Sequence, residues 1–135
     1  MSELRSIPEG AVMPLGAHDV DALQRQAHDA GQTVLRADCG AAADKADVMQ
    51  ALGAAFALPP HFGRNLDALY DCLLDLRADP AAAEPGFLVI VRDLPAGETF
   101  DDDERDALLA VFRDAAQHHC ERGTTFRVLY SVRSE

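Results

Sequence analysis

Basic residues are scarce in this sequence. Its 135 residues include 12 lysines and arginines against 23 aspartates and glutamates, which leaves a formal net charge of -11. A protein that binds nucleic acid needs a basic surface, because its cations displace the counterions that surround the phosphates. The composition therefore argues against a nucleic-acid partner. It favours a basic partner, or an acidic surface that serves solubility alone.

Cysteine is also sparse, and its three positions, Cys39, Cys72 and Cys120, show no paired spacing. An odd number without a repeated short spacing fits neither a disulfide framework nor a zinc site. We therefore expect reduced thiols, as in the cytoplasm, with no metal and no other cofactor.

Long apolar runs are missing as well. The first residues, MSELRSIPEG, lack the apolar core of a signal peptide. No stretch approaches the roughly 20 apolar residues of a membrane-spanning helix. These features predict a cytoplasmic protein with no membrane partner. The hydrophobic content of 48% is still enough to fill one core in a chain of this length.

The apolar pattern predicts an alternation of strands and helices. Strands are expected at 11–15, 32–38, 86–91 and 125–132, and helices at 18–30, 44–57, 66–77 and 102–118. Pro14 would confine the first strand to an edge or a strand end. The continuous apolar run at 87–91 is typical of a strand that is covered on both faces. The expected fold class is α/β, a single layer of mostly parallel strands covered by helices.

The stretch 58–76 reads LPPHFGRNLDALYDCLLDL and enters a helix through two prolines and a glycine. The prolines stop the preceding helix, and Asn65 is a good N-cap for the next one. An aspartate at every fourth position, Asp67, Asp71 and Asp75, predicts an acidic stripe. Leucines at spacings of three and four predict a buried face on the same helix. These are Leu66, Leu69, Leu73 and Leu76.

The pair Asp67 and Asp71 is the main candidate for function. Side chains four residues apart on a helix project in the same direction. Two exposed carboxylates at this spacing therefore repel each other unless a cation pairs with both. A site that holds phosphates with Lys, Arg and His is such a partner. The plain alternative is a solvated helix face, on which Asp67 merely favours the positive helix N-terminus.

The run ALPPHFGRNLDALYDCLLDL resembles the barstar family, intracellular protein inhibitors of the ribonuclease barnase. The shared pattern is LP, FG, NLDAL, an aromatic residue and DCL. A VLRAD run before it, LVIV after it and VFRDA near the end extend the resemblance over residues 32–131. It implies a barstar-like domain at 32–135, with an N-terminal extension at 1–31 that adds a strand and a helix.

The resemblance also implies a set of partner-binding residues. The residue that matches Asp71 is the central anchor in barstar-like proteins, and the one that matches Asp67 is a second acidic contact. Asp114, in VFRDA, stands where barstar has Glu, which makes a weaker peripheral contact. The remaining implied positions lie in the loop and along the helix: His61, Gly63, Asn65, Tyr70, Asp75 and Leu76.

Besides Asp114, four of these positions depart from the family. Barstar has Tyr in place of His61, Trp in place of Tyr70, Gly in place of Asp75 and Trp in place of Leu76. The changes leave the charged anchors intact and alter the shape around them. They therefore bear on which partner is bound more than on the mode of action.

The leading interpretation is a non-catalytic inhibitor, monomeric when free, that blocks the active site of a basic ribonuclease or nuclease toxin. A small hydrolase or metal-dependent enzyme using Asp67, Asp71 and His61 is the second interpretation. It is weaker because no nucleophile sits in a recognised setting and no histidine pair has ligand spacing. The third is an acidic interaction domain without inhibitory activity.

Overall fold

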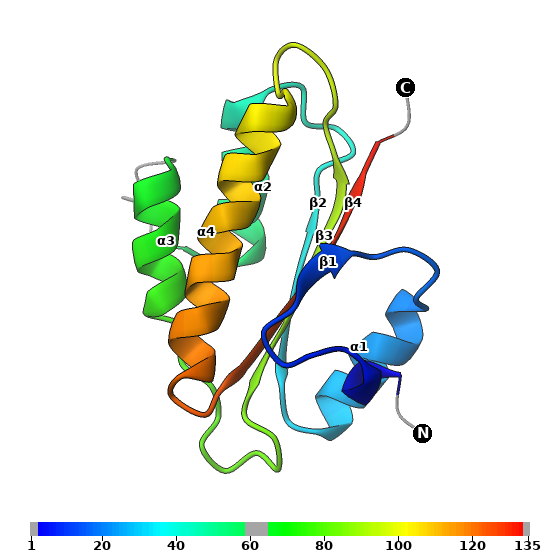
Figure 1. Ribbon diagram of the computed structural model, residues 1–135, viewed down its shortest axis with the longest axis vertical. Helices are drawn as coiled ribbons and strands as arrows, with labels where there is room; N and C mark the ends of the chain where they lie inside the picture. The colour runs from blue at the N-terminus through cyan, green and yellow to red at the C-terminus, as the bar shows by residue number, and fades with distance from the viewer. Residues whose placement is uncertain (1–2, 59–64, 134–135) are drawn as a thin grey trace.

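The computed structural model describes residues 3–58 and 65–133. Within them, all strands run parallel in one sheet of order β1-β4-β3-β2 (Figure 1). The predicted α/β class is confirmed. In chain order the elements are η1 (Leu4–Ser6), β1 (Val12–Pro14), α1 (Val20–Asp29), β2 (Thr33–Asp38), α2 (Lys45–Ala55), α3 (Leu66–Leu74), β3 (Gly86–Leu94), α4 (Asp102–Cys120) and β4 (Thr125–Val132).

Helices cover both faces of the sheet (Figure 1), with α2, α3 and α4 on one side and α1 on the other. The central strand β3 explains this arrangement, because successive side chains of a strand point to opposite faces. Phe87 and Val89 enter the larger core under α2 and α4, whereas Leu88 and Ile90 enter the smaller core under α1. All four side chains are buried, as expected of a strand that is covered twice.

Residues 3–30 supply the cover on the second face. β1 lies at the sheet edge, where Val12 stands beside Val128 of β4. Pro14 ends this strand, in agreement with its missing backbone donor. Leu4, Leu23 and other residues of η1 and α1 bury their side chains in the smaller core. The expected strand and helix are therefore present and packed. The division into an extension at 1–31 and a domain at 32–135 stays a prediction.

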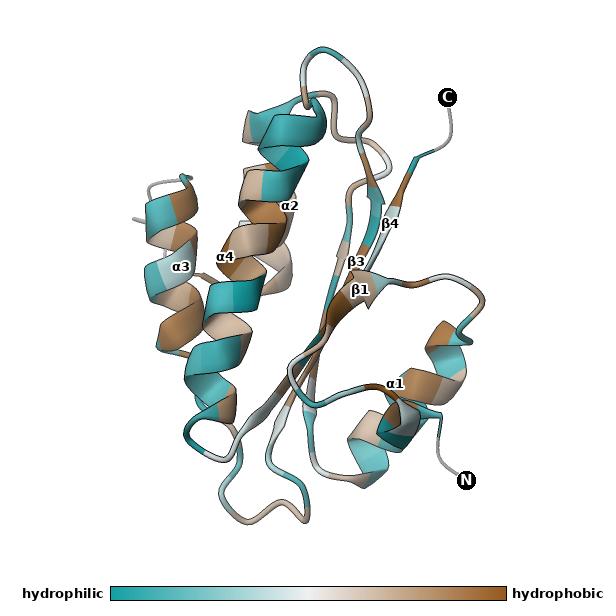
Figure 2. Cartoon of the chain, viewed as in Figure 1, coloured by the Kyte–Doolittle hydropathy of each residue, from teal (hydrophilic) through white to brown (hydrophobic). Residues whose placement is uncertain are grey.

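Helix α3 is shorter than its leucine spacing predicts and ends at Leu74 rather than near residue 77. The backbone N–H of Leu76 bonds to the carbonyl of Leu73, which tightens the last turn. Further along the chain, Pro80 disfavours helical geometry in Asp79, the residue before it. In Figure 2, hydrophilic and hydrophobic bands alternate along α3, as expected of an amphipathic helix.

Strand β3 is longer than the apolar run predicts and continues to Leu94. Its pairing with β4 shifts register between Val91 and Leu94, where Asp93 adopts a φ of 60°. A bulge of this kind lets a strand continue past an irregular residue, and Asp tolerates the left-handed region better than most side chains. The additional residues of β3 bring the chain to the loop before α4.

Candidate functional site

Helix α3 is capped and held by a small number of contacts. The Asn65 side chain accepts a 2.8 Å hydrogen bond from the backbone N–H of Ala68, as predicted for its N-cap. Leu69 and Leu73 are fully buried, and α3 packs against α4. The leucine face predicted from spacing is therefore confirmed at its centre. Leu66 and Leu76, at its ends, are half-buried against the same core.

A buried histidine fixes the C-terminal half of α3. Nε2 of His119, in the last turn of α4, lies 2.8 Å from the carbonyl oxygen of Leu73. A carbonyl only accepts, so Nε2 carries the hydrogen and donates it. The ring of His119 stacks on Phe126, with centroids 5.1 Å apart and planes 3° apart. Sequence reasoning did not identify this contact, which links two helices across 46 positions of the chain.

The acidic stripe faces solvent. Asp67, Asp71 and Asp75 are all exposed, on the side of α3 opposite its buried leucines. Within residues 3–58 and 65–133, no ion pair involves any of the three. Asp67 lies in the first turn, where the helix dipole favours a negative charge, but Asp75 lies at the C-cap, where it does not. The stripe therefore carries repulsion that an external cation can relieve.

The other residues implied at the site are distributed around this stripe. Asn65 is exposed at the start of α3, and Tyr70 is half-buried on the helix itself. Asp114 is exposed on α4, the helix that packs beside α3 (Figure 1). His61 and Gly63 lie outside the described residues. The structure thus brings the α3 residues and Asp114 onto two neighbouring helices.

The cysteines offer no activated thiol. All three are free, and burial raises the pKa of each one. The pKa of Cys39 rises to about 11, with Asp38 adding to the effect of burial. The pKa of Cys72, which follows Asp71, is raised by burial and then by the charges of Asp75 and Asp71. A raised pKa lowers the thiolate fraction and opposes nucleophilic chemistry.

In the described part of the chain, no group of three or more His, Cys, Asp or Glu side chains is placed to hold a metal ion. The same residues contain no helix with the length and apolar character needed to cross a membrane. What the site presents chemically is a row of solvated carboxylates on a fixed helix. Such a row can accept hydrogen bonds and pair with cations.

Comparison with known families gives one finding that bears on this surface. The family model described as Barstar (barnase inhibitor) matches residues 32–131. The match covers more than half of the chain. It includes all of the residues implied at the site, the first of which is His61 and the last Asp114. It also spans β2, α2, α3, β3 and α4 in full.

Proposed function

This chain belongs to the barstar family, and we propose that it inhibits a basic, barnase-like ribonuclease. On this proposal, the acidic face of α3 and the loop before it cover the nuclease active site without any catalytic step. The observation that carries the proposal is the exposed stripe of Asp67, Asp71 and Asp75. It lies on a helix that is fixed by buried leucines and a histidine hydrogen bond.

The inhibitory action follows from charge and rigidity. A ribonuclease holds phosphates with cationic side chains, and a helical row of carboxylates can occupy the same positions. Asp71 lies at the centre of the row, with one aspartate a turn before it and one a turn after it. Arg pairs with a carboxylate through two parallel hydrogen bonds. A rigid row of carboxylates therefore provides geometric specificity as well as charge attraction. RNA and inhibitor then compete for the same groups.

The family match supports a non-enzymatic role over the hydrolase interpretation, since the family is described as an inhibitor. An acidic interaction domain without inhibitory activity makes a different prediction from an inhibitor. It would bind a basic nuclease and leave RNA cleavage unchanged. The two are separated by capturing ribonucleases from a lysate on the immobilised protein and then measuring RNA cleavage with added inhibitor. Loss of cleavage at equimolar inhibitor supports the proposal, and full cleavage by the bound nuclease contradicts it.

We expect association with the captured nuclease to slow as salt rises. The net charge of -11 attracts a basic partner over a distance that salt shortens, from about 10 Å at 0.1 M to about 3 Å at 1 M. Electrostatic steering acts mainly on encounter, so the association rate should fall much more than the dissociation rate rises. Stopped-flow mixing over this range measures both rates. Association rates that stay flat would count against steering.

Replacing Asp114 with alanine should weaken binding much less than a change on the stripe. The side chain is exposed on α4, beside the helix that carries the stripe, and the family resemblance implies a peripheral contact there. Charges at the rim of an interface stay partly solvated and contribute little to affinity. A titration of nuclease activity against Asp114→Ala and the parent protein gives the comparison. A loss as large as that of a central residue would show that Asp114 is not at the rim.

A further inference from the structure

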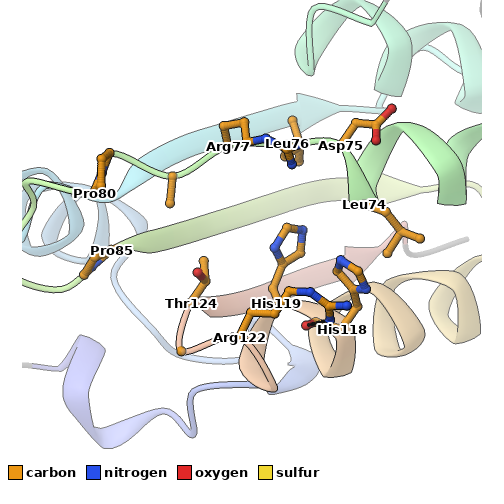
Figure 3. A pocket seen from close by; sticks show the side chains of 12 residues that line it. Leu74, Asp75, Leu76, Arg77, Pro80, Pro85, His118, His119, Arg122 and Thr124 are labelled. Carbon is orange, nitrogen blue, oxygen red and sulfur yellow. Dashed lines mark hydrogen bonds between the residues drawn. The ribbon is translucent and has the colours of Figure 1, made fainter.

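A cleft of about 740 Å³ opens between the end of α3 and the end of α4 (Figure 3). Asp75, Leu76 and Arg77 form one side of it, and His118 and Arg122 lie on the other side. We call this space the cationic cleft. Its walls come from the C-terminal ends of α3 and α4 and from the segments that follow each helix, including Pro80, Pro85 and Thr124. The hydrogen bond between His119 and Leu73 ties the two helices together.

The cationic cleft concentrates positive charge in an acidic protein. Among the residues that line it, Asp75 is the single carboxylate against the two guanidinium groups of Arg77 and Arg122. Arg122 donates a 2.8 Å hydrogen bond to the carbonyl of His118, which complements the negative end of α4. Among the residues that the structure describes, no ion pair or second hydrogen bond engages its guanidinium group. Arg77 is exposed and forms no ion pair within residues 3–58 and 65–133.

The pKa of His118 is lowered beside these two arginines. Its partial burial and the charge of Arg122 lower its pKa, with smaller effects of the same sign from His119 and Arg77. Glu121 opposes them. Arg122 and Arg77, which both line the cleft, therefore act on this ring in the same direction as its burial.

The cationic cleft is continuous with the acidic face. Asp75 belongs to the stripe and also lines the cleft. His118 lies four residues after Asp114 in α4, so the two side chains share a face of that helix. The acidic stripe therefore meets the cleft at Asp75, and the face of α4 that carries Asp114 meets it at His118.

We infer that the cationic cleft receives an acidic side chain of the nuclease, so that the contact face carries charges of both signs. This inference rests on the proposed function. A guanidinium group pairs with a carboxylate through two hydrogen bonds, which fixes register between the surfaces. A nuclease without an acidic side chain opposite the cleft leaves Arg77 and Arg122 unpaired and is bound less tightly. The cleft thus sets which basic nuclease is accepted.

The test compares two charge reversals. Arg77→Glu changes the cleft, and Arg25→Glu changes an exposed residue of α1, on the opposite face of the sheet. Both make the net charge more negative by the same amount, so long-range attraction to a basic nuclease alone would strengthen binding equally. We expect Arg77→Glu to weaken affinity for the captured nuclease roughly ten-fold. Arg25→Glu should not weaken it. Melting temperatures of both variants establish that each one is folded.

Equal affinities of Arg77→Glu and Arg25→Glu would overturn the inference. Asp71→Ala, measured in the same series, keeps this result separate from the proposed function. If Asp71→Ala loses affinity while the two charge-reversal variants bind equally tightly, the proposed cleft contact is wrong but the proposed inhibitory face is retained. If Asp71→Ala also binds like the parent protein, the proposed function fails. As a positive control, one Asp or Glu of the nuclease changed to Lys should restore the affinity of Arg77→Glu.

Discussion

Replacing Asp71 with alanine should cost ~2–5 kcal/mol or more of binding free energy, a range partly drawn from the barstar family's own complex with barnase. Asp71 is exposed at the middle of the stripe, between Asp67 and Asp75. In the complex it should be fully desolvated and paired with more than one cation. Alanine removes those charge-assisted bonds and leaves buried cations unpaired, which is why the loss is large.

The same substitution should hardly change folding. Asp71 forms no ion pair in the described part of the chain, and its removal relieves repulsion from the aspartates one turn away. The free energy of unfolding should therefore stay within about 0.5 kcal/mol of the parent value, as is usual for a surface change. Affinity for the captured nuclease and chemical denaturation measure the two quantities. If Asp71→Ala binds as tightly as the parent protein, the stripe is not the inhibitory surface.

The helix that carries the stripe was predictable because its signals are local. An N-cap side chain reaches a backbone N–H three residues away, and a buried face needs only regular leucine spacing. Asn65 obeys the first rule, and Leu69 and Leu73 obey the second. Once the buried face of α3 is known, the opposite face is the one exposed to solvent. The solvent exposure of Asp67, Asp71 and Asp75 was therefore predictable without any knowledge of the neighbouring helix, although Asp75 is the C-cap and not part of the helix itself.

Features that depend on distant contacts were not predictable in this way. His119 is polar, yet it is 5% exposed, because the carbonyl of Leu73 and the ring of Phe126 accommodate it. The positive φ of Asp93 depends on pairing with β4 and leaves no trace in the apolar pattern. The cationic cleft likewise joins Arg77 to Arg122, which are far apart in sequence. The predicted contacts of His61 and Gly63 lie outside the described residues.

The second large effect is expected at Leu73, two residues after the central aspartate. Its side chain is fully buried between α3 and the larger core. Leu73→Ala removes buried methyl groups and leaves a cavity that the surroundings fill only in part. The free energy of unfolding should fall by ~2–5 kcal/mol. Leu73→Met keeps most of the volume and should cost less than about 1.5 kcal/mol. Urea denaturation of the two variants and the parent protein measures both values.

Leu73→Ala should nevertheless bind the captured nuclease almost normally at temperatures where it is folded. Residues two apart on a helix point about 200° away from each other, so Leu73 and Asp71 lie on opposite faces. The substitution also leaves the backbone carbonyl of Leu73 in place to accept the hydrogen bond from His119. Stability and binding should therefore separate, with Leu73→Ala losing the first and Asp71→Ala the second. A folded Leu73→Ala protein with lost affinity would show instead that α3 moves when its core face is truncated, and that the position of the stripe depends on that packing.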